Sequence, residues 1–246
     1  MQFGRHISGQ FNVELESIRT QVLTMGGLVE QQLSFAMQAL HKEDEALARK
    51  VVQDDDKVDE MDLSINEACT RIIAKRQPTA KDLRLIMAIV KTMTDLERVG
   101  DVATQIMKIT VLADDRALHS SSQRTHTRYA FMLEGLFRQT ITMLHRTLDA
   151  FARMDLEAAI DVHQLDDQID TECHVVCDQL TLAMTEDTQQ IPYLIQLMRS
   201  AQALERVGDR CQNLCEYLIY FVTGKDVRHM SPVELKMIVQ KALSES

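Results

Sequence analysis

The strongest constraint on the fold of this chain is an internal duplication. The hexapeptide Leu-Glu-Arg-Val-Gly-Asp occupies residues 96–101 and occurs again at residues 204–209. An acidic segment repeats upstream in the same order, because residues 55–59 and residues 166–170 both carry aspartates at their first, second and fifth positions. A unit present twice in 246 residues predicts two halves of similar size and similar fold.

Composition and apolar spacing indicate that each half is helical. The chain has only 8 glycines and 3 prolines, while strong helix formers abound. Apolar side chains between residues 11 and 29 alternate spacings of four and three, which is typical of the seam of a helical bundle. The same spacing returns between residues 137 and 151. We therefore predict an all-α fold of two tandem three-helix bundles.

Local signals place the other helices. Asp44 and Asp155 occupy equivalent positions, and each is expected to cap the second helix of its half, because its carboxylate can accept hydrogen bonds from first-turn amides. Third helices are expected over about residues 79–112, opened by a Thr79–Asp82 capping pair, and over about residues 192–222, opened by a proline. The predicted division is a first bundle (1–113), a linker (114–127), a second bundle (128–224) and a C-terminal tail (225–246).

Charge and cysteine usage restrict the partners and the compartment. The formal net charge of −10 works against non-specific binding to nucleic acid, so no nucleic-acid partner is expected. Five cysteines behind a polar amino-terminal segment favour a reducing compartment over a disulfide framework. No apolar run approaches the roughly 18 to 20 residues that span a bilayer. We expect a soluble cytoplasmic protein.

The repeated acids form four pairs, each with a spacing of four residues. The pairs are Glu97 with Asp101, Glu205 with Asp209, Asp55 with Asp59, and Asp166 with Asp170. At about 100° per residue, the acids of the hexapeptide point away from the apolar stripe of their helix and are expected to be exposed. Like charges at this spacing cost roughly 0.2 to 0.5 kcal/mol per pair, so a compensating interaction is expected.

Two interpretations of the acid pairs remain open at this point. Carboxylates from two neighbouring helices provide the oxygen ligands that hard cations such as Mg²⁺, Mn²⁺, Ca²⁺ or iron prefer, which predicts divalent or iron-type metal ions at surface carboxylate clusters. Alternatively, the acids form a solvated face that pairs with basic neighbours such as Lys57, Arg98 or Arg206.

Gly100 and Gly208 each lie between the two acids of the repeated hexapeptide. Glycine inside a helix costs about 1 kcal/mol relative to alanine and therefore calls for a reason. Either a neighbouring helix or a metal cluster comes close to the glycine, or the helices simply pack tightly there. The sequence leaves both explanations open.

Signatures of common enzyme classes are missing from the sequence. It has no phosphate-binding Walker loop, no dinucleotide-binding glycine motif, no zinc-protease motif and no nucleophile elbow. No histidine follows a glutamate by three positions, as the di-iron carboxylate enzymes require. We therefore expect no catalytic residues and no enzymatic activity.

These residues resemble those of the PhoU family. The resemblance spans nearly the whole chain and rests on both hexapeptides, on Arg-Ile-Ile-Ala-Lys-Arg-Gln-Pro-Thr-Ala (71–80) and on Asp-Arg-Cys-Gln-Asn-Leu-Cys-Glu-Tyr (209–217). It implies two three-helix bundles related by a pseudo-two-fold axis, with metal-binding Glu/Asp-x-x-x-Asp motifs on their surface. Glu97, Asp101, Glu205 and Asp209 match those motifs directly, and Asp55, Asp59, Asp166 and Asp170 match them less closely.

The resemblance also implies a function and partners. Members of this family are negative regulators of the phosphate-starvation (Pho) regulon and modulators of phosphate uptake, acting as adaptors between the phosphate ABC transporter and a sensor histidine kinase. The implied contacts are the ATPase subunit of the transporter, the cytoplasmic sensor portion of the kinase and a second copy of the chain, with the membrane reached only through these partners. The alternative is a metal-storage or metal-dependent hydrolytic protein that uses the carboxylate pairs.

Overall fold

The computed structural model of the chain describes residues 9–111 and 128–244. Over these residues every regular element is a helix, which confirms the all-α prediction. The first half contains α1 (Gly9–Lys42), α2 (Glu45–Arg76) and α3 (Ala80–Thr110). The second half contains η1 (Phe131–Leu133), α5 (Glu134–Arg153), α6 (Leu156–His163), α7 (Asp166–Glu186), η2 (Thr188–Gln190) and α8 (Ile191–Thr223), and it is followed by α9 (Pro232–Ser244).

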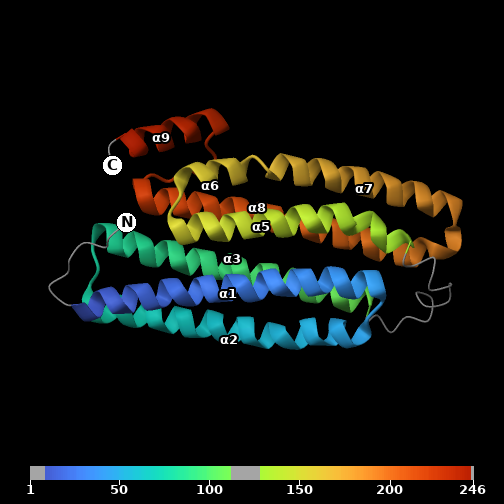
Figure 1. Cartoon of the computed structure of the whole chain (residues 1–246), viewed down its shortest axis with the longest axis horizontal. Helices are drawn as coiled ribbons and strands as arrows, with labels where there is room; N and C mark the ends of the chain where they lie inside the picture. The colour runs from blue at the N-terminus through green and yellow to red at the C-terminus, as the bar shows by residue number, and fades with distance from the viewer. Residues whose placement is uncertain (1–8, 112–127, 245–246) are drawn as a thin grey trace.

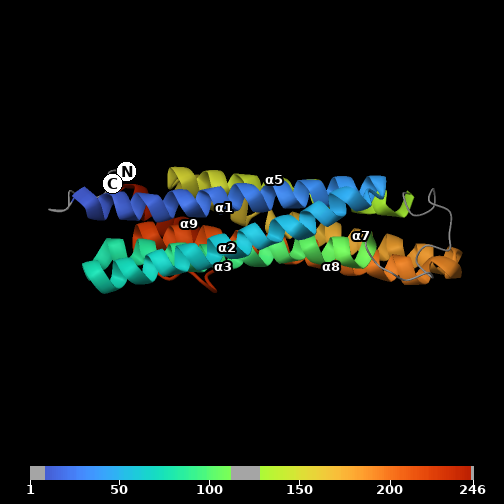
Figure 2. The same cartoon turned by 90° about the horizontal axis from the view of Figure 1, so that it is seen from below.

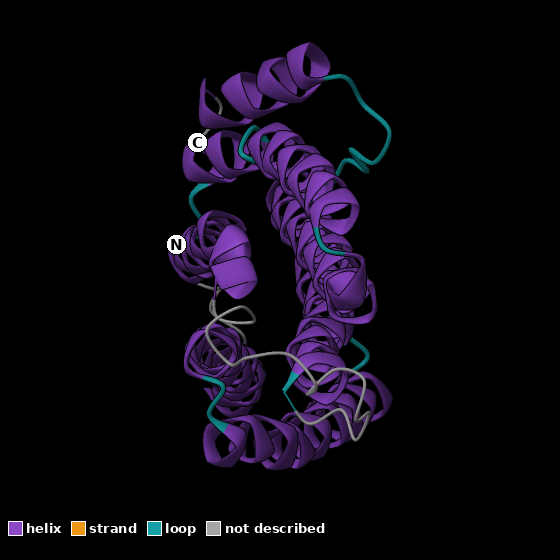
Figure 3. Cartoon of the chain, turned by 90° about the vertical axis from the view of Figure 1, so that its right-hand side faces the viewer, coloured by secondary structure: helices purple, strands orange, loops and turns teal. Residues whose placement is uncertain are grey.

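The long helices run along the long axis of the molecule in both views (Figure 1 and Figure 2). Figure 1 shows two groups of helices, with α1, α2 and α3 of the first half below α5, α6, α7 and α8 of the second, and Figure 3 views the helices nearly end on. The groups meet through equivalent helices, because α3 packs on α8 and α1 packs on α5. Contacts between equivalent elements are what a two-fold relation between the halves produces. Apolar side chains of both halves share one continuous core, so the two bundles form one packed unit.

The predicted helix caps are confirmed in the second helix of each half. The amide of Leu47 donates to Asp44 Oδ1 at 3.0 Å, and the amide of Ala158 donates to Asp155 Oδ1 at 3.0 Å. Each bond satisfies a first-turn amide that has no partner within the helix. The predicted capping pair of α3 is only half right, because Thr79 occupies the cap position without a side-chain capping bond.

The second half departs from the predicted pattern at one place. Where α2 is continuous, its counterpart is split into α6 and α7 by a turn at residues 164–165. The equivalent of Leu165, counted from the two caps, is Asp54, which is partly buried and pairs with Lys57 at 2.6 Å. Leu165 instead packs against the core. Leu165 lies three residues after the buried Val162 and four before the buried Ile169, the spacing that places it on the buried side.

The ends of the predicted halves have different outcomes. The predicted linker at residues 114–127 lies outside the described residues, and the boundaries drawn around it stay predictions. The predicted C-terminal tail is largely a helix, because α9 packs against α6 and α8 and buries Leu235 and Val239. None of the helices in the described part of the chain combines the length and apolarity needed to cross a membrane.

Candidate functional site

The structure brings the four acid pairs together as two clusters, one in each half. We define the first carboxylate cluster as Asp55, Asp59 and Asp62 of α2 with Glu97 and Asp101 of α3, and the second carboxylate cluster as Asp166 and Asp170 of α7 with Glu205 and Asp209 of α8. Members of each cluster perturb one another, so acids from two neighbouring helices do share one site. Pairing of acids across helices, which the sequence only allowed, is therefore what the fold produces.

Exposure differs among the acids more than the sequence indicated. Asp101 and Asp209 are exposed as expected, while Glu97 and Glu205 are partly buried. Asp166 departs furthest from the expected surface position, since only 8% of it is exposed. It is the first residue of α7, immediately after the turn that separates this helix from α6, and it faces α8.

Burial and mutual repulsion raise the pKa of several of these carboxyl groups. In the first cluster, burial raises the pKa of Asp55 and of Glu97, and Asp101 and Asp59 raise both further. In the second cluster, burial raises the pKa of Asp166 to about 7, helped by the charges of Asp170 and Asp209. Each cluster is thus a place where negative charge is crowded and poorly solvated, so a bound cation or a proton would stabilise it.

The repeated glycines allow these carboxylates to approach. A Cβ atom on Gly208 would lie 2.7 Å from Asp166 Oδ1, and one on Gly100 would lie 3.0 Å from Asp55 Oδ1 and 3.1 Å from Gln32 Oε1. Real Cβ atoms essentially never come closer than 3.0 Å to such an atom, as one on Gly208 would, and contacts of 3.0 to 3.4 Å, as at Gly100, are unusually tight. Close approach of a neighbouring helix is therefore the explanation that the structure selects for both glycines, and the approaching group is a carboxylate.

The two clusters differ in how that approaching carboxylate is satisfied. In the first half, the buried Gln32 of α1 donates from Nε2 to Asp55 Oδ1 at 3.2 Å. Counted twelve residues back from each cap, the counterpart of Gln32 is the buried Met143, which has no hydrogen to donate in this way. Asp166 Oδ1 is accordingly buried without a hydrogen-bond partner in the described chain. In the second cluster the unsatisfied acceptor is thus a carboxylate oxygen, whereas beside the first cluster it is the amide oxygen of Gln32.

The cluster residues offer the type of ligand that a hard cation prefers, but among the described residues they do not form a complete coordination shell. The donors are carboxylate oxygens, and an unpartnered oxygen of Asp166 points at the glycine of the repeat. Within residues 9–111 and 128–244, however, no three acidic, histidine or cysteine side chains are arranged to hold one ion together. An ion that keeps several of its waters and uses one or two carboxylates, as Mg²⁺ commonly does, matches this arrangement.

Two contributors to the clusters were missed at the sequence level. Asp62 is three residues from Asp59, and its own pKa is raised by burial and by that neighbour. The counterpart of Asp62 in the second half is Cys173, so Asp62 is not part of the repeated pattern of acids. Gln32 lies three residues after Val29 and so continues the four-three spacing of the first apolar seam. A polar side chain at such a buried position is the feature of the sequence that could have indicated its role.

A buried polar network joins the two halves beside the clusters. Asp95 of α3 is 3% exposed and accepts a hydrogen bond from the Tyr217 hydroxyl of α8 at 2.9 Å. The guanidinium of Arg210, also on α8, lies 3.5 Å from the same carboxylate. A buried charge held by several groups of a second helix fixes how the two helices face each other. No pattern in the sequence indicates this network, because Asp95 has no repeated partner.

Comparison with known proteins agrees with this arrangement. The PhoU domain family model matches residues 22–110 and 133–218, one match in each half. The phosphate-specific transport system accessory protein PhoU of Serratia marcescens is 51% identical over 97% of this chain and 95% of the relative, and that of Escherichia coli strain K12 is 49% identical over 97% and 96%.

Solved structures of similar proteins share the architecture. The crystal structure of PhoU from Pseudomonas aeruginosa has a TM-score of 0.79 at 38% identity and covers 87% of this chain and 100% of that one. The phosphate transport system regulatory protein PhoU from Streptococcus pneumoniae has a TM-score of 0.76 at 28% identity and covers 88% of this chain and 99% of that one.

Proposed function

The chain belongs to the PhoU family, and from this premise we propose that it is an accessory protein of a phosphate transport system that represses the phosphate-starvation regulon when phosphate is plentiful. The carrying observation is the near-complete match to relatives that bear the accessory-protein name, at about half identity over almost their full length. The protein would act in the cytoplasm as an adaptor, binding the ATPase subunit of the transporter and the sensor portion of a histidine kinase, and would itself form a homodimer.

The proposed mode of action is binding and not catalysis. The relatives are named for an accessory role, which does not favour the alternative of metal storage or metal-dependent hydrolysis. Two rigid helical halves joined by a shared core and a buried polar network offer two related surfaces on one body. An adaptor that must contact two partners can use such a duplicated surface.

Deletion in the source organism tests the regulatory role. Loss of the gene should raise alkaline phosphatase activity in phosphate-rich medium, and a plasmid copy should restore repression. A deletion strain that keeps the regulon silent would contradict the proposal. Pull-down from phosphate-rich and phosphate-starved cells then tests the adaptor role, because the transporter ATPase and the kinase should both be recovered with the tagged chain.

We also propose that the carboxylate clusters bind hydrated divalent cations. A bound cation would relieve the crowding that raises the pKa of Asp166 and Glu97 and would link α7 to α8 and α2 to α3. Titration calorimetry with Mn²⁺ and Mg²⁺ on the purified protein should detect binding that weakens in Glu205→Gln. Asp178→Asn, an exposed acid of α7 outside the cluster, is the matched control. Equal binding by both variants would refute the assignment.

A further inference from the structure

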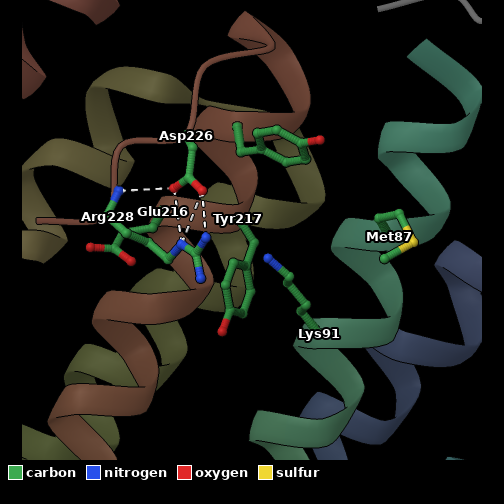
Figure 4. A pocket seen from close by; sticks show the side chains of 7 residues that line it. Met87, Lys91, Glu216, Tyr217, Asp226 and Arg228 are labelled. Carbon is green, nitrogen blue, oxygen red and sulfur yellow. Dashed lines mark hydrogen bonds and ion pairs between the residues drawn. The ribbon is translucent and has the colours of Figure 1, made fainter. Parts of the chain in front are cut away.

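A small polar cavity lies where the two halves meet, and none of the residues that line it belongs to either carboxylate cluster. It is lined by Met87 and Lys91 of α3, by Glu216, Tyr217 and Tyr220 of α8, and by Asp226 and Arg228 of the loop that leads to α9. Figure 4 shows Lys91 extending from α3 toward the side chains that α8 and this loop contribute. The volume of the cavity is about 130 Å³, which is below the roughly 300 to 1,000 Å³ of pockets for drug-sized ligands. The cavity therefore suits an ion of a few atoms.

One charged pair in the cavity is already satisfied. Arg228 donates from Nε to Asp226 Oδ1 at 2.9 Å, and its Nη2 donates to Asp226 Oδ2 (Figure 4). These bonds lower the pKa of Asp226 to about 2, so its charge is held and balanced by Arg228. A guanidinium has five N–H donors, and those of Arg228 that do not contact Asp226 remain available.

The other two charged groups lack such a pairing in the described part of the chain. The Lys91 ammonium lies 5.2 Å from the ring centre of Tyr217 and 6.0 Å from that of Tyr220, and it forms no ion pair with a described residue. Glu216 is partly buried and has no described hydrogen-bond partner. Burial and the charge of Asp226 raise its pKa, and the charges of His229, Arg228 and Lys91 oppose that rise. The cavity therefore presents cationic donors on one side and a carboxylate acceptor on another.

One wall of the cavity is held in place by a buried hydrogen bond. The Tyr217 hydroxyl is bound to the buried Asp95, so its ring is held in place beside Lys91. The cavity uses both halves, because Lys91 comes from α3 while Glu216 comes from α8. A ligand that met both groups would join the two halves at their interface.

We propose that this cavity binds a protonated tetrahedral oxyanion, the chemistry of inorganic phosphate and of a phosphate monoester in its singly protonated form. Its oxygens accept from Lys91 and from the free donors of Arg228, and its P–OH donates to Glu216. Sulfate carries no proton at neutral pH, so it would be repelled by Glu216 and would leave that acceptor unpaired. Binding of the anion depends only on the residues of the cavity, whereas any part of this binding in regulation rests on the proposed function.

Equilibrium dialysis of labelled inorganic phosphate against the purified full chain tests the proposal. We expect saturable binding, weakened about tenfold or more in Lys91→Gln because a charge-assisted donor is lost. Lys108→Gln, an exposed lysine of the same helix, should bind as the unmodified protein does, and circular dichroism should confirm that both variants fold. Absence of saturable binding, or equal binding by the two variants, would overturn the site.

Competition with sulfate and with glycerol phosphate completes the test. Sulfate should compete poorly with the unmodified protein and about tenfold better with Glu216→Gln, whose amide can donate to an unprotonated oxygen. Equal competition by sulfate and phosphate in the unmodified protein would refute the role of Glu216. Tighter binding of inorganic phosphate identifies the free ion as ligand, and tighter binding of glycerol phosphate identifies an ester. The alkaline phosphatase assay is separate, so the regulatory role and this site can fail independently.

Discussion

Replacing Gly208 by alanine probes the close approach that shapes the second carboxylate cluster. Alanine inside a helix is favoured over glycine by about 1 kcal/mol. Here, however, the new Cβ would lie 2.7 Å from Asp166 Oδ1 and 3.4 Å from side-chain carbons of Ile169. Forcing extra atoms into a packed site typically costs about 1 to 3 kcal/mol. The free energy of unfolding of Gly208→Ala should therefore fall by about 0 to 2 kcal/mol, the difference between these two effects.

Gly27 provides the matched control for this substitution. It lies inside α1, is exposed, and has open space at the position that a new methyl group would occupy. Gly27→Ala should raise the free energy of unfolding by about 0.5 to 1 kcal/mol. Guanidinium unfolding followed by far-ultraviolet circular dichroism measures both variants. If Gly208→Ala were stabilised as much as Gly27→Ala, the close contact would not constrain this helix pair.

A double variant identifies the group responsible. Removing the Asp166 carboxylate in an Asp166→Ala background should make Gly208→Ala stabilising, because the obstructing oxygen is gone. The coupling between the two substitutions should therefore be about 1 to 3 kcal/mol, within the range seen for residues in contact. Coupling near zero would show that the methyl group meets some other obstacle.

Three further predictions concern charge and capping. The pKa of Asp166 is about 7 in the folded state against a usual 3.8, so between these pH values the folded state keeps a proton that the unfolded chain releases. The free energy of unfolding should therefore fall as the pH rises from about 4 to about 7. Measured by urea unfolding, the unmodified protein should lose about 2 to 4 kcal/mol over that range relative to Asp166→Asn. Asp95→Ala leaves the Tyr217 hydroxyl and Arg210 without their shared carboxylate, so it should lower the free energy of unfolding by about 2 to 4 kcal/mol. Tyr217→Phe removes only one of these interactions and should lower it by about 1 to 2 kcal/mol in the same chemical unfolding experiment. Asp155→Ala should cost about 1 kcal/mol through loss of its helix cap, seen as a lower melting temperature, and an unchanged value would contradict the cap.

The clusters show where prediction from spacing succeeds and where it stops. A spacing of four on a helix places Glu205 and Asp209 on one face whatever surrounds them, and both lie outside the apolar stripe as predicted. Spacing says nothing about the helix opposite. The burial of Asp166 follows from its position at the turn before α7 and from the glycine that faces it on α8, and neither can be read from the acidic segment itself.

The same distinction separates the two halves from their interface. Duplication, helix-forming composition and the caps Asp44 and Asp155 determine the helices locally, because these signals act within a turn or two of the chain. Asp95 and Lys91 look like ordinary helix residues in the sequence. Their roles arise only because α3 packs on α8, which brings Tyr217 to each of them.

The sequence by itself determined that this protein is an all-α duplication with two sets of paired acids, since repeats and periodicity are properties of the chain. Tertiary structure alone decided which acid is buried, which buried acceptor has no partner, and that charged groups of both halves enclose one small cavity. The physical reason is that desolvation and charge interaction depend on distances through space, and packing between helices sets those distances.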